Sequence, residues 1–339
     1  MTSDRPSTPD DTWRGVRVVV TGAGGFIGSY LVERLVVLGA EATAFLRYNS
    51  RSEKGLIDEC PEDVRSQIRV VWGDLRDPDS LRRGFGRAEV IFHLGALVGI
   101  PYSYDSPRQY VDTNVVGTLN VLEAARASEV RRVIHTSTSE VYGTPIYTPI
   151  DEKHPLQGQS PYSATKIGAD KIVESFWRAF GLPATTIRPF NTFGPRQSAR
   201  AILPAIIRQA LNRSTIRLGS IEPVRDMNFV ADTIDAFIRI ARCDAALGRV
   251  VNVGSGRGQT VGEMVESVSK ILGKSLQVTT EEQRVRPPSS EVAELIADAT
   301  LAKQLFGWQP STSFEEGLRA TVEWFGGSRF RHDPAEYVV

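Results

Sequence analysis

A short β-branched run followed by a glycine-rich turn is the feature that most limits how this chain can fold. Residues 16–20 read VRVVV, the next segment reads TGAGGFIG, and residues 29–39 form the amphipathic run SYLVERLVVLG. Gly22, Gly25 and Gly28 thus lie between a predicted strand and a predicted helix, the setting that a dinucleotide-binding fingerprint requires. Glycines permit close backbone approach, and the free N–H groups of a helix N-terminus can bind a pyrophosphate. The sequence therefore predicts a dinucleotide site at its start.

Short apolar runs and helical stretches alternate along the chain as far as residue 190. The predicted strands are residues 16–20, 41–46, 68–75, 90–96, 131–138 and 183–190. Helical stretches such as residues 111–127 and 161–180 separate them. This alternation predicts an α/β fold of the Rossmann type, in which helices cover both faces of a doubly wound parallel sheet.

The regular alternation of apolar runs and helical stretches ends after Pro189. Proline becomes more frequent, and helices are predicted at residues 202–212, 230–242, 261–272 and 312–325. We expect a smaller, interleaved α/β lobe that binds the substrate. The expected division is a flexible tail (1–14), a dinucleotide-binding domain (15–190, rejoined by about 226–255), a lobe (mostly 191–330) and a second tail (331–339).

The charge balance argues against two classes of partner. The chain has 40 basic and 40 acidic residues, so neither nucleic acid nor an anionic membrane is an expected partner. No apolar run approaches the roughly 18 residues of a membrane span, and the first residues lack the apolar core of a signal peptide. We expect a cytoplasmic protein.

The cysteines and histidines show no metal-ligand spacing. Cys60 and Cys243 lie far apart, which suits a reducing compartment. His93 and His135 lie at the ends of predicted strands and are expected to be packed and neutral. We therefore expect no metal site.

The end of the second predicted strand bears on the choice of dinucleotide. An NAD site usually places an acid there to bind the ribose 2′-hydroxyl. This strand ends FLRYNSR, with Arg47 in place of the acid and Ser50 and Arg51 close behind. Because an arginine fork suits a 2′-phosphate, the residues favour NADP, with NAD as the alternative. The other interpretation is that both arginines are solvated surface charges that bind no cofactor.

A tyrosine and a lysine form the candidate catalytic pair. Tyr162 and Lys166 are four residues apart on a predicted helix, so both point the same way. A lysine beside a tyrosine can lower the pKa of the phenol, which could then take a hydroxyl proton while hydride leaves the same carbon. The spacing alone occurs by chance in many helices, but here a phosphate loop and the segment STSE precede it.

Eight segments form a recognisable set: TGAGGFIG, GDLRD, HLGA, DTNVVGTLNVLEAA, STSEVYG, YSATK, RPFNTFGPRQ and RDMNFVAD. Together they resemble the extended short-chain dehydrogenase/reductase superfamily, specifically its nucleotide-sugar epimerases and dehydratases. The resemblance implies that Thr138 binds the sugar 4-hydroxyl, that Tyr162 is the base and that Lys166 orients the nicotinamide ribose. It also implies a tightly held, recycled dinucleotide, further contacted by Phe26, Ile27, Asp74, Leu75, Leu94 and Ala96.

Glu140 separates the reactions of this family. Its 4,6-dehydratases have a glutamate two residues after the threonine, which takes the C5 proton once C4 is a ketone, whereas epimerases commonly lack it. The sequence Thr138-Ser139-Glu140 departs from the Thr-Asp-Glu of glucose-type dehydratases. It resembles GDP-mannose 4,6-dehydratases and, equally, UDP-glucuronate decarboxylases. Neighbouring segments resemble the dehydratases of legionaminic-acid-type pathways, which act on nucleotide-linked N-acetylglucosamine. The sequence does not identify the acid that protonates the departing C6 hydroxyl. Glu140 could be both the base for C5 and, through a relay, this acid.

The resemblance also implies a nucleotide-diphosphate-sugar site and a homodimer. Asn191, Arg225 and Arg286 would lie near the diphosphate, and Arg196 is an equally plausible contact. The helices that begin near residues 110 and 162 would build a four-helix dimer interface. The expected function is a 4,6-dehydratase. A UDP-glucuronate decarboxylase, a 4-epimerase and a non-catalytic dinucleotide-binding regulator are the alternatives.

Overall fold

The computed structural model of the chain describes residues 13–284, 287 and 289–327. Within them, a sheet of seven strands has the order β10-β6-β5-β4-β1-β2-β3, and every neighbouring pair is parallel. The strands are β1 (Arg17–Thr21), β2 (Glu41–Arg47), β3 (Arg69–Gly73), β4 (Val90–His93), β5 (Arg132–Thr136), β6 (Ala184–Pro189) and β10 (Val250–Val253). The predicted Rossmann-type α/β fold is confirmed.

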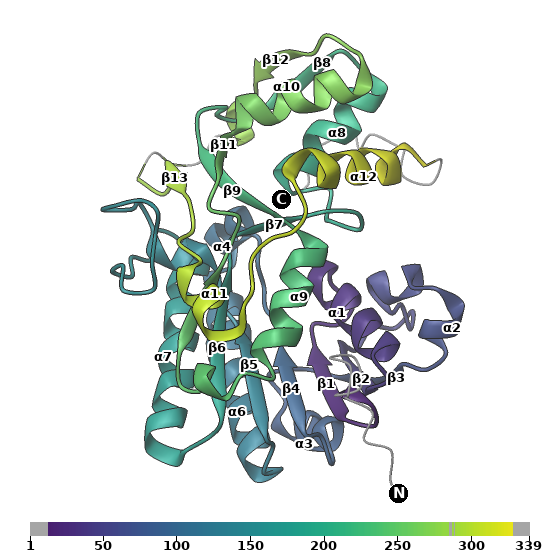
Figure 1. Cartoon of the computed structure of the whole chain (residues 1–339), viewed down its shortest axis with the longest axis vertical. Coiled ribbons are helices and arrows are strands. Elements are labelled where there is room, and N and C mark those ends of the chain that lie inside the picture. The colour runs from purple at the N-terminus through teal and green to yellow at the C-terminus, as the bar shows by residue number, and fades with distance from the viewer. Residues whose placement is uncertain (1–12, 285–286, 288, 328–339) are drawn as a thin grey trace, which may run out of the picture.

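Helices cover both faces of this sheet (Figure 1). One face bears α1 (Phe26–Val37), α9 (Val230–Ile240) and α11 (Thr300–Phe306); the other bears α3 (Pro78–Phe85), α6 (Gly117–Ala127) and α7 (Pro161–Phe180). Short helical segments occur at α2 (Glu62–Arg65), α4 (Ile100–Asp105), α5 (Pro107–Tyr110) and a π-helical turn (Val111–Val116).

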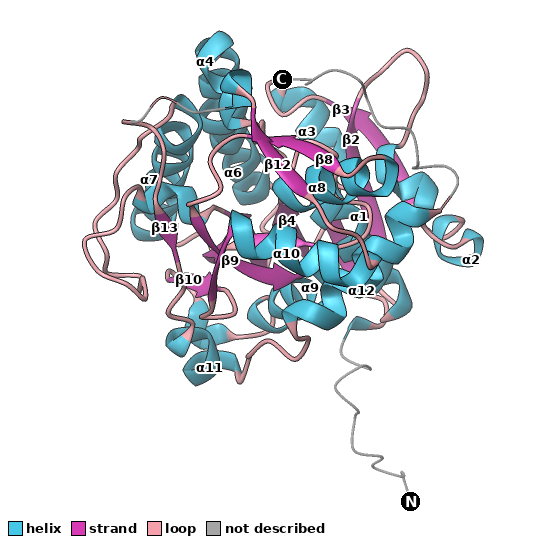
Figure 2. Cartoon of the chain, turned by 90° about the horizontal axis from the view of Figure 1, so that it is seen from above, coloured by secondary structure: helices cyan, strands magenta, loops and turns pink. Residues whose placement is uncertain are grey.

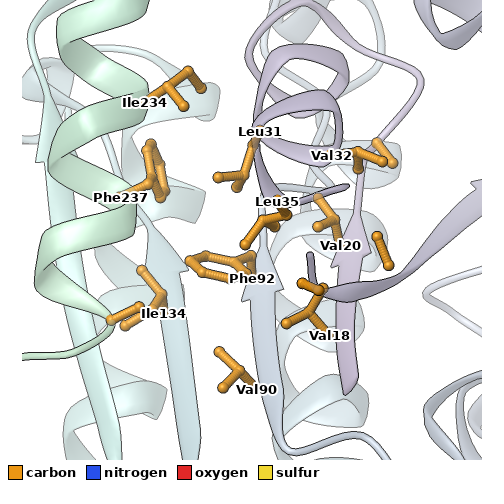
Figure 3. Close-up of a cluster of buried hydrophobic side chains, with 14 of the residues drawn as sticks. Val18, Val20, Leu31, Val32, Leu35, Val90, Phe92, Ile134, Ile234 and Phe237 are labelled. Atoms are coloured by element: carbon orange, nitrogen blue, oxygen red, sulfur yellow. The ribbon is translucent and has the colours of Figure 1, made fainter. Parts of the chain in front are cut away.

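Alternate residues of the strands supply two separate cores, because successive side chains of a strand point to opposite faces. Val18 and Val20 pack with Leu31 and Leu35 of α1 and Phe237 of α9, as Figure 3 shows. The intervening residues face the second core, whose buried members include Val19, Ile91, Val133, Leu81 and Val121.

The smaller lobe lies beyond the carboxyl ends of the main strands and carries its own sheets (Figures 1 and 2). In the described part of the lobe, β9 (Val224–Phe229) pairs with β7 (Asn191–Phe193), β11 (Gly258–Thr260) and β13 (Glu294–Leu295), and β8 (Thr215–Leu218) pairs with β12 (Gln277–Thr280). Its helices are α8 (Ile202–Asn212), α10 (Val261–Leu272) and α12 (Phe314–Gly326). The chain then crosses between the two parts, because α9 follows β9 directly and packs on α1. None of the described helices is both long and apolar enough to cross a bilayer.

The predicted N-terminal tail needs a correction at its inner end. Trp13 is 1% exposed and belongs to the core that α1 and α9 cover. Its ring centroid lies 6.0 Å from that of Phe92 on β4, and the Arg242 guanidinium lies 5.4 Å from the Trp13 ring. The folded domain therefore includes residue 13, although the polar residues around it suggested a loose tail.

We expect Trp13→Ala to lower the free energy of unfolding by about 3 kcal/mol, because it removes a fully buried indole and leaves a cavity. Urea denaturation measures the change. Tyr48→Ala is the control, because Tyr48 is 72% exposed and its loss should cost under about 0.5 kcal/mol. A loss at Trp13 no larger than that of the control would contradict the assignment of Trp13 to the core.

Candidate active site

The glycine loop after β1 is a backbone cradle in which side chains do not fit. A Cβ atom on Gly22 would lie 2.8 Å from the backbone nitrogen of Gly95 in the loop after β4. One on Gly28 would lie 2.2 Å from the carbonyl oxygen of Gly22. Gly25 N donates to the Gly22 oxygen at 3.0 Å and closes the turn that leads into α1. The loop also lies where the strand order reverses between β1 and β4, the place where open α/β sheets bind ligands.

A cavity of about 170 Å³ opens beside this cradle and is lined by five of the predicted cofactor residues. Its lining includes Gly22, Arg47, Asp74, Leu75 and Ala96, contributed by the carboxyl ends of four different strands. This cradle and cavity fit a dinucleotide, with the glycine loop for the pyrophosphate and the polar residues for a ribose.

Five other predicted cofactor residues do not line this cavity: Phe26, Ile27, Leu94, Ser50 and Arg51. Phe26 and Ile27 begin α1, and both pack partly against the core. Leu94 follows β4 and also packs there. Ser50 and Arg51 are exposed, and Arg51 pairs with Glu53 at 3.5 Å.

Asp74 carries the negative charge of the cavity. Its carboxylate accepts from the Arg76 guanidinium at 2.6 Å. That hydrogen bond lowers the pKa of Asp74, and the charge of Arg47 also lowers it. The cavity wall therefore combines an ionised carboxylate with two guanidinium groups, an arrangement that can bind hydroxyl groups or an anion.

Thr138 and Glu140 lie on a tight turn directly after β5. Thr138 caps the 3-10 turn Ser139–Tyr142, and its Oγ1 accepts from the backbone N–H of Glu140 at 3.2 Å. Thr138 and Glu140 are both partly exposed, whereas Ser139 is buried. The turn therefore places a partly exposed threonine and a partly exposed glutamate two residues apart at the carboxyl end of the sheet, with the buried Ser139 between them.

Tyr162 and Lys166 come from the first turns of α7, and local signals fix where this helix begins. Ser160 and Ser163 form a capping box, and Pro161 occupies the first helical position. Lys166 Nζ donates to the carbonyl oxygen of Thr136 at 2.7 Å, which docks α7 on the end of β5. The structure thus brings together the predicted catalytic residues Thr138, Glu140, Tyr162 and Lys166.

The electrostatics of the pair differ from the expectation that Lys166 activates the phenol. Burial raises the pKa of Tyr162 above its ordinary value; a hydrogen bond with Thr138 opposes the rise, and the charge of Glu140 adds to it. Burial lowers the pKa of Lys166 to about 8, and the Asp170 charge opposes that shift. Burial therefore favours the protonated form of the Tyr162 phenol.

Asn114 is a site residue that the sequence reasoning missed. It is 1% exposed in the π-helical turn, and its Oδ1 accepts from the backbone N–H of Leu97 at 2.8 Å. Its Nδ2 donates to the Leu97 carbonyl and to Thr165 Oγ1, next to Lys166. Asn114 thus ties the loop after β4 to α7. The sequence signal for Asn114 was a polar residue within the apolar pattern of DTNVVGTLNVLEAA. The structure adds a second signal, because π-helical turns often occur at functional sites.

The two histidines at strand ends are packed and neutral, as expected. His93 lies between the hydroxyls of Thr21 and Thr118 at 2.8 and 3.0 Å, and burial lowers its pKa well below its ordinary value. Burial lowers the pKa of His135 to about 4. Among the described residues, no group of three His, Cys, Asp or Glu side chains is placed to hold a metal ion.

The predicted substrate residues have different surroundings. Asn191 begins β7, and its buried Oδ1 has no hydrogen-bond partner within the described residues. Arg225 on β9 is buried and donates to Glu291 Oε1 at 3.1 Å.

Arg196 lies against α1 of the main domain rather than among these lobe residues. Its guanidinium pairs with Glu33 at 2.6 Å and lies 4.3 Å from the Tyr30 ring centroid. Because its guanidinium is paired with Glu33, we do not propose Arg196 as a substrate contact. Arg286 lies outside the described residues.

Comparison with known proteins places this geometry among enzymes of nucleotide sugars. The family model for GDP-mannose 4,6 dehydratase matches residues 19–321. A UDP-glucose 4-epimerase of Mycolicibacterium smegmatis is 35% identical, over 91% of this chain and 98% of the relative. A UDP-N-acetyl-alpha-D-glucosaminuronate decarboxylase of Bacillus cytotoxicus is 28% identical, over 91% and 97%. The crystal structure of DesIV, a dTDP-glucose 4,6-dehydratase of Streptomyces venezuelae with NAD and TYD bound, superposes with a TM-score of 0.82 at 27% identity, over 93% of this chain and 98% of that one.

Proposed function

The chain belongs to the GDP-mannose 4,6-dehydratase-type family of nucleotide-sugar epimerases and dehydratases, and on that premise we propose that it is a nucleotide-sugar 4,6-dehydratase. The proposed substrate is a nucleotide-linked N-acetylglucosamine, and the product is its 4-keto-6-deoxy sugar. One observation carries the proposal: the Glu140 carboxylate lies on the turn that Thr138 caps, close enough to Tyr162 for its charge to raise the phenol's pKa. Epimerisation at C4 needs no second proton acceptor, whereas elimination across C5 and C6 does.

The residues divide the chemistry between two proton acceptors. Thr138 orients the sugar 4-hydroxyl, and Tyr162 takes its proton as C4 becomes a ketone. A dinucleotide held by the glycine loop and Lys166 would supply positive charge, a hydride acceptor for C4 and a hydride donor for C6. The ketone acidifies the C5 hydrogen, which Glu140 removes, and the C6 hydroxyl leaves as water. C5 regains a proton from solvent, so the net reaction is loss of one water with no net redox change.

The acid that protonates the departing C6 hydroxyl is also part of the proposal. Ser139 has no carboxyl group and is 3% exposed, so it is badly placed to be that acid. Glu140, once it holds the C5 proton, is the remaining acid on this turn. We propose that it returns a proton to the C6 hydroxyl through a relay.

A decarboxylase is the second candidate. The sequence Thr138-Ser139-Glu140 favours it, because it resembles UDP-glucuronate decarboxylases as much as GDP-mannose 4,6-dehydratases. A substrate panel separates the reactions: purified protein is incubated with UDP-N-acetylglucosamine, its GDP counterpart and UDP-glucuronate. Mass spectrometry gives the masses of the products, and proton NMR gives their configuration. The dehydratase predicts a product one water lighter from an N-acetylglucosamine substrate. Loss of carbon dioxide from the glucuronate alone would establish the decarboxylase instead. A product of unchanged mass with an inverted C4 would establish an epimerase.

We propose NADP as the preferred cofactor, although the similar dehydratase structure contains NAD. Arg47 supports the proposal because it ends β2, is exposed and lines the cavity beside the glycine loop. Its charge also acts on Asp74 across this cavity. A guanidinium there can bind a 2′-phosphate, which a carboxylate would repel.

Arg47→Ala is expected to lower the ratio of NADP to NAD affinity by about tenfold, because one charge-assisted contact to the 2′-phosphate is lost. Isothermal titration with each dinucleotide measures the ratio. Arg51→Ala is the matched control, since the Arg51 side chain is 81% exposed and faces Glu53. An equal loss of affinity for both dinucleotides would mean that Arg47 does not read the 2′ position.

A cytoplasmic homodimer completes the proposal. The π-helical turn and its junction with α6 expose the apolar side chains of Val111 and Val116, which are 43% and 40% exposed. Leu122, further along the same helix, is fully buried against the sheet. The exposed residues support the expected helical interface, because apolar side chains gathered on one helix favour contact with a partner.

A further inference from the structure

Asp170 is a buried carboxylate that the proposed reaction does not use. It lies one helical turn after Lys166 on α7 and is 4% exposed. Its Oδ2 accepts from Ser137 Oγ at 2.8 Å and from the Arg188 guanidinium at 2.8 and 3.2 Å. Its Oδ1 lies 3.2 Å from His135 Nε2. One side chain thus joins α7 to β5, through His135 and Ser137, and to β6, through Arg188.

A second layer of contacts extends from Asp170 to the turn that carries Glu140. The Arg188 guanidinium donates to the Tyr142 hydroxyl at 2.9 Å, and its carbon lies 4.9 Å from the Tyr142 ring centroid. The Tyr142 hydroxyl donates to Asn252 Oδ1 on β10 at 2.7 Å. Since Tyr142 ends the turn Ser139–Tyr142, this chain of contacts holds the last residue of the turn. The hydrogen bond between Ser137 and Asp170 holds the residue that directly precedes Thr138.

We propose that Asp170 is a positioning residue of the active site, which fixes the Thr138–Glu140 turn through Ser137 and Arg188 and acts as the counter-charge of Lys166. The inference rests on the proposed function. Buried polar groups need partners, and a connected network of buried hydrogen bonds favours one arrangement of its members. Asp170 is the centre of this network, while the Nδ1 of His135 has no hydrogen-bond partner within the described residues. Losing one member would leave its direct partners with fewer hydrogen bonds in a dry interior.

The charges around Lys166 make Asp170 its main source of negative charge. His135 on β5 and His93 on β4 are both neutral at pH 7, because burial lowers their pKa values. Arg188 on β6 is positive. Toward the candidate catalytic turn, the buried Tyr162 is a neutral phenol, and Glu140 adds a carboxylate on the turn after β5. Burial favours the neutral form of Lys166, and the Asp170 charge opposes this effect. Removing that charge should therefore let Lys166 lose its proton at lower pH.

Two variants separate charge from positioning. Asp170→Asn removes the charge and keeps the shape, whereas Ser137→Ala keeps the charge and cuts only the link to the Thr138 turn. Asp232→Asn is the matched control, because Asp232 is also 4% exposed but caps the backbone of Ser311 and Thr312. All proteins are loaded with dinucleotide, and Lys166 is followed by carbon-13 NMR of its Cε between about pH 6 and pH 10. The Lys166 signal is assigned by its loss in Lys166→Met.

We expect the titration midpoint of Lys166 to fall by about one pH unit or more in Asp170→Asn and to stay unchanged in Ser137→Ala and Asp232→Asn. We expect Ser137→Ala to lower kcat about tenfold with little change in KM, because the Thr138 turn loses one support. An unchanged midpoint in Asp170→Asn overturns the counter-charge role, and an unchanged kcat in Ser137→Ala overturns the positioning role. If Asp170→Asn does not fold, Ser137→Ala still decides the positioning role.

The NMR titration needs no substrate. It therefore tests the counter-charge role of Asp170 even if the wild-type protein dehydrates no nucleotide sugar. In that case the proposed function fails while the titration still reports the counter-charge role. If wild-type activity is present and the midpoint does not move, the proposed function stands and the inference about Asp170 fails.

Discussion

Replacing Glu140 with glutamine is expected to stop dehydration while oxidation at C4 continues. The amide has the shape of the carboxylate but cannot take the C5 proton, so the rate of water loss should fall by about a thousandfold. The turn itself should persist, because Thr138 Oγ1 accepts from the backbone N–H of residue 140 and not from its side chain. The variant should therefore accumulate reduced cofactor and a 4-keto sugar that retains its C6 hydroxyl.

Two readings taken together test this expectation. Stopped-flow absorbance after mixing with substrate follows cofactor reduction, and mass spectrometry of the quenched reaction follows water loss. Glu123→Gln is the control, because Glu123 is exposed on α6 and the variant should behave as the wild type. Dehydration at the wild-type rate in Glu140→Gln, or complete loss of cofactor reduction, would contradict the role given to Glu140.

Replacing Tyr162 with phenylalanine is expected to remove the first step instead. Without the phenol, no group accepts the 4-hydroxyl proton as hydride leaves, so cofactor reduction should slow by about a thousandfold. The aromatic ring stays and can keep its edge-on contact with Tyr110, whose ring centroid lies 6.2 Å away. Dinucleotide affinity should therefore change by less than about twofold.

The pH dependence of the first step follows from the raised pKa of Tyr162. The phenol must lose its proton before it can accept one, so the rate of cofactor reduction in a single turnover should rise from neutral to alkaline pH. In Tyr162→Phe the residual rate should lack this rise. Tyr110→Phe is the control: it removes a neighbouring hydroxyl, which donates to the Gly99 carbonyl, and keeps the Tyr162 phenol, so this variant should keep the alkaline rise. A rise that persists in Tyr162→Phe would assign it to another group.

Features that depend on neighbouring residues were predictable from the sequence. Helix α7 begins and ends where expected because Ser160, Pro161 and Gly181 are local start and stop signals. The glycine loop was equally clear, since its spacing between a β-branched run and an amphipathic run is itself the signal. The types of the candidate catalytic residues were visible for the same reason.

Features that depend on distant residues were not predictable. Arg196 pairs with Glu33, 163 positions away, so a surface or substrate role could not be distinguished from an ion pair with α1. Trp13 is buried by residues of α9 and β4, while its sequence neighbours are polar. The strands of the lobe, such as β7 and β13, are too short to show a period. The contacts of Asp170 likewise join residues on three elements.

The central claim is that one hydride leaves C4 and the same hydride arrives at C6. The most direct test incubates the protein, in ordinary water, with UDP-N-acetylglucosamine or its GDP counterpart labelled with deuterium at C4, and locates the label by NMR. The account predicts a 4-keto product whose 6-methyl group carries the deuterium. A label that remains at C4 on a sugar with inverted configuration, and no methyl signal, would contradict the account and establish an epimerase.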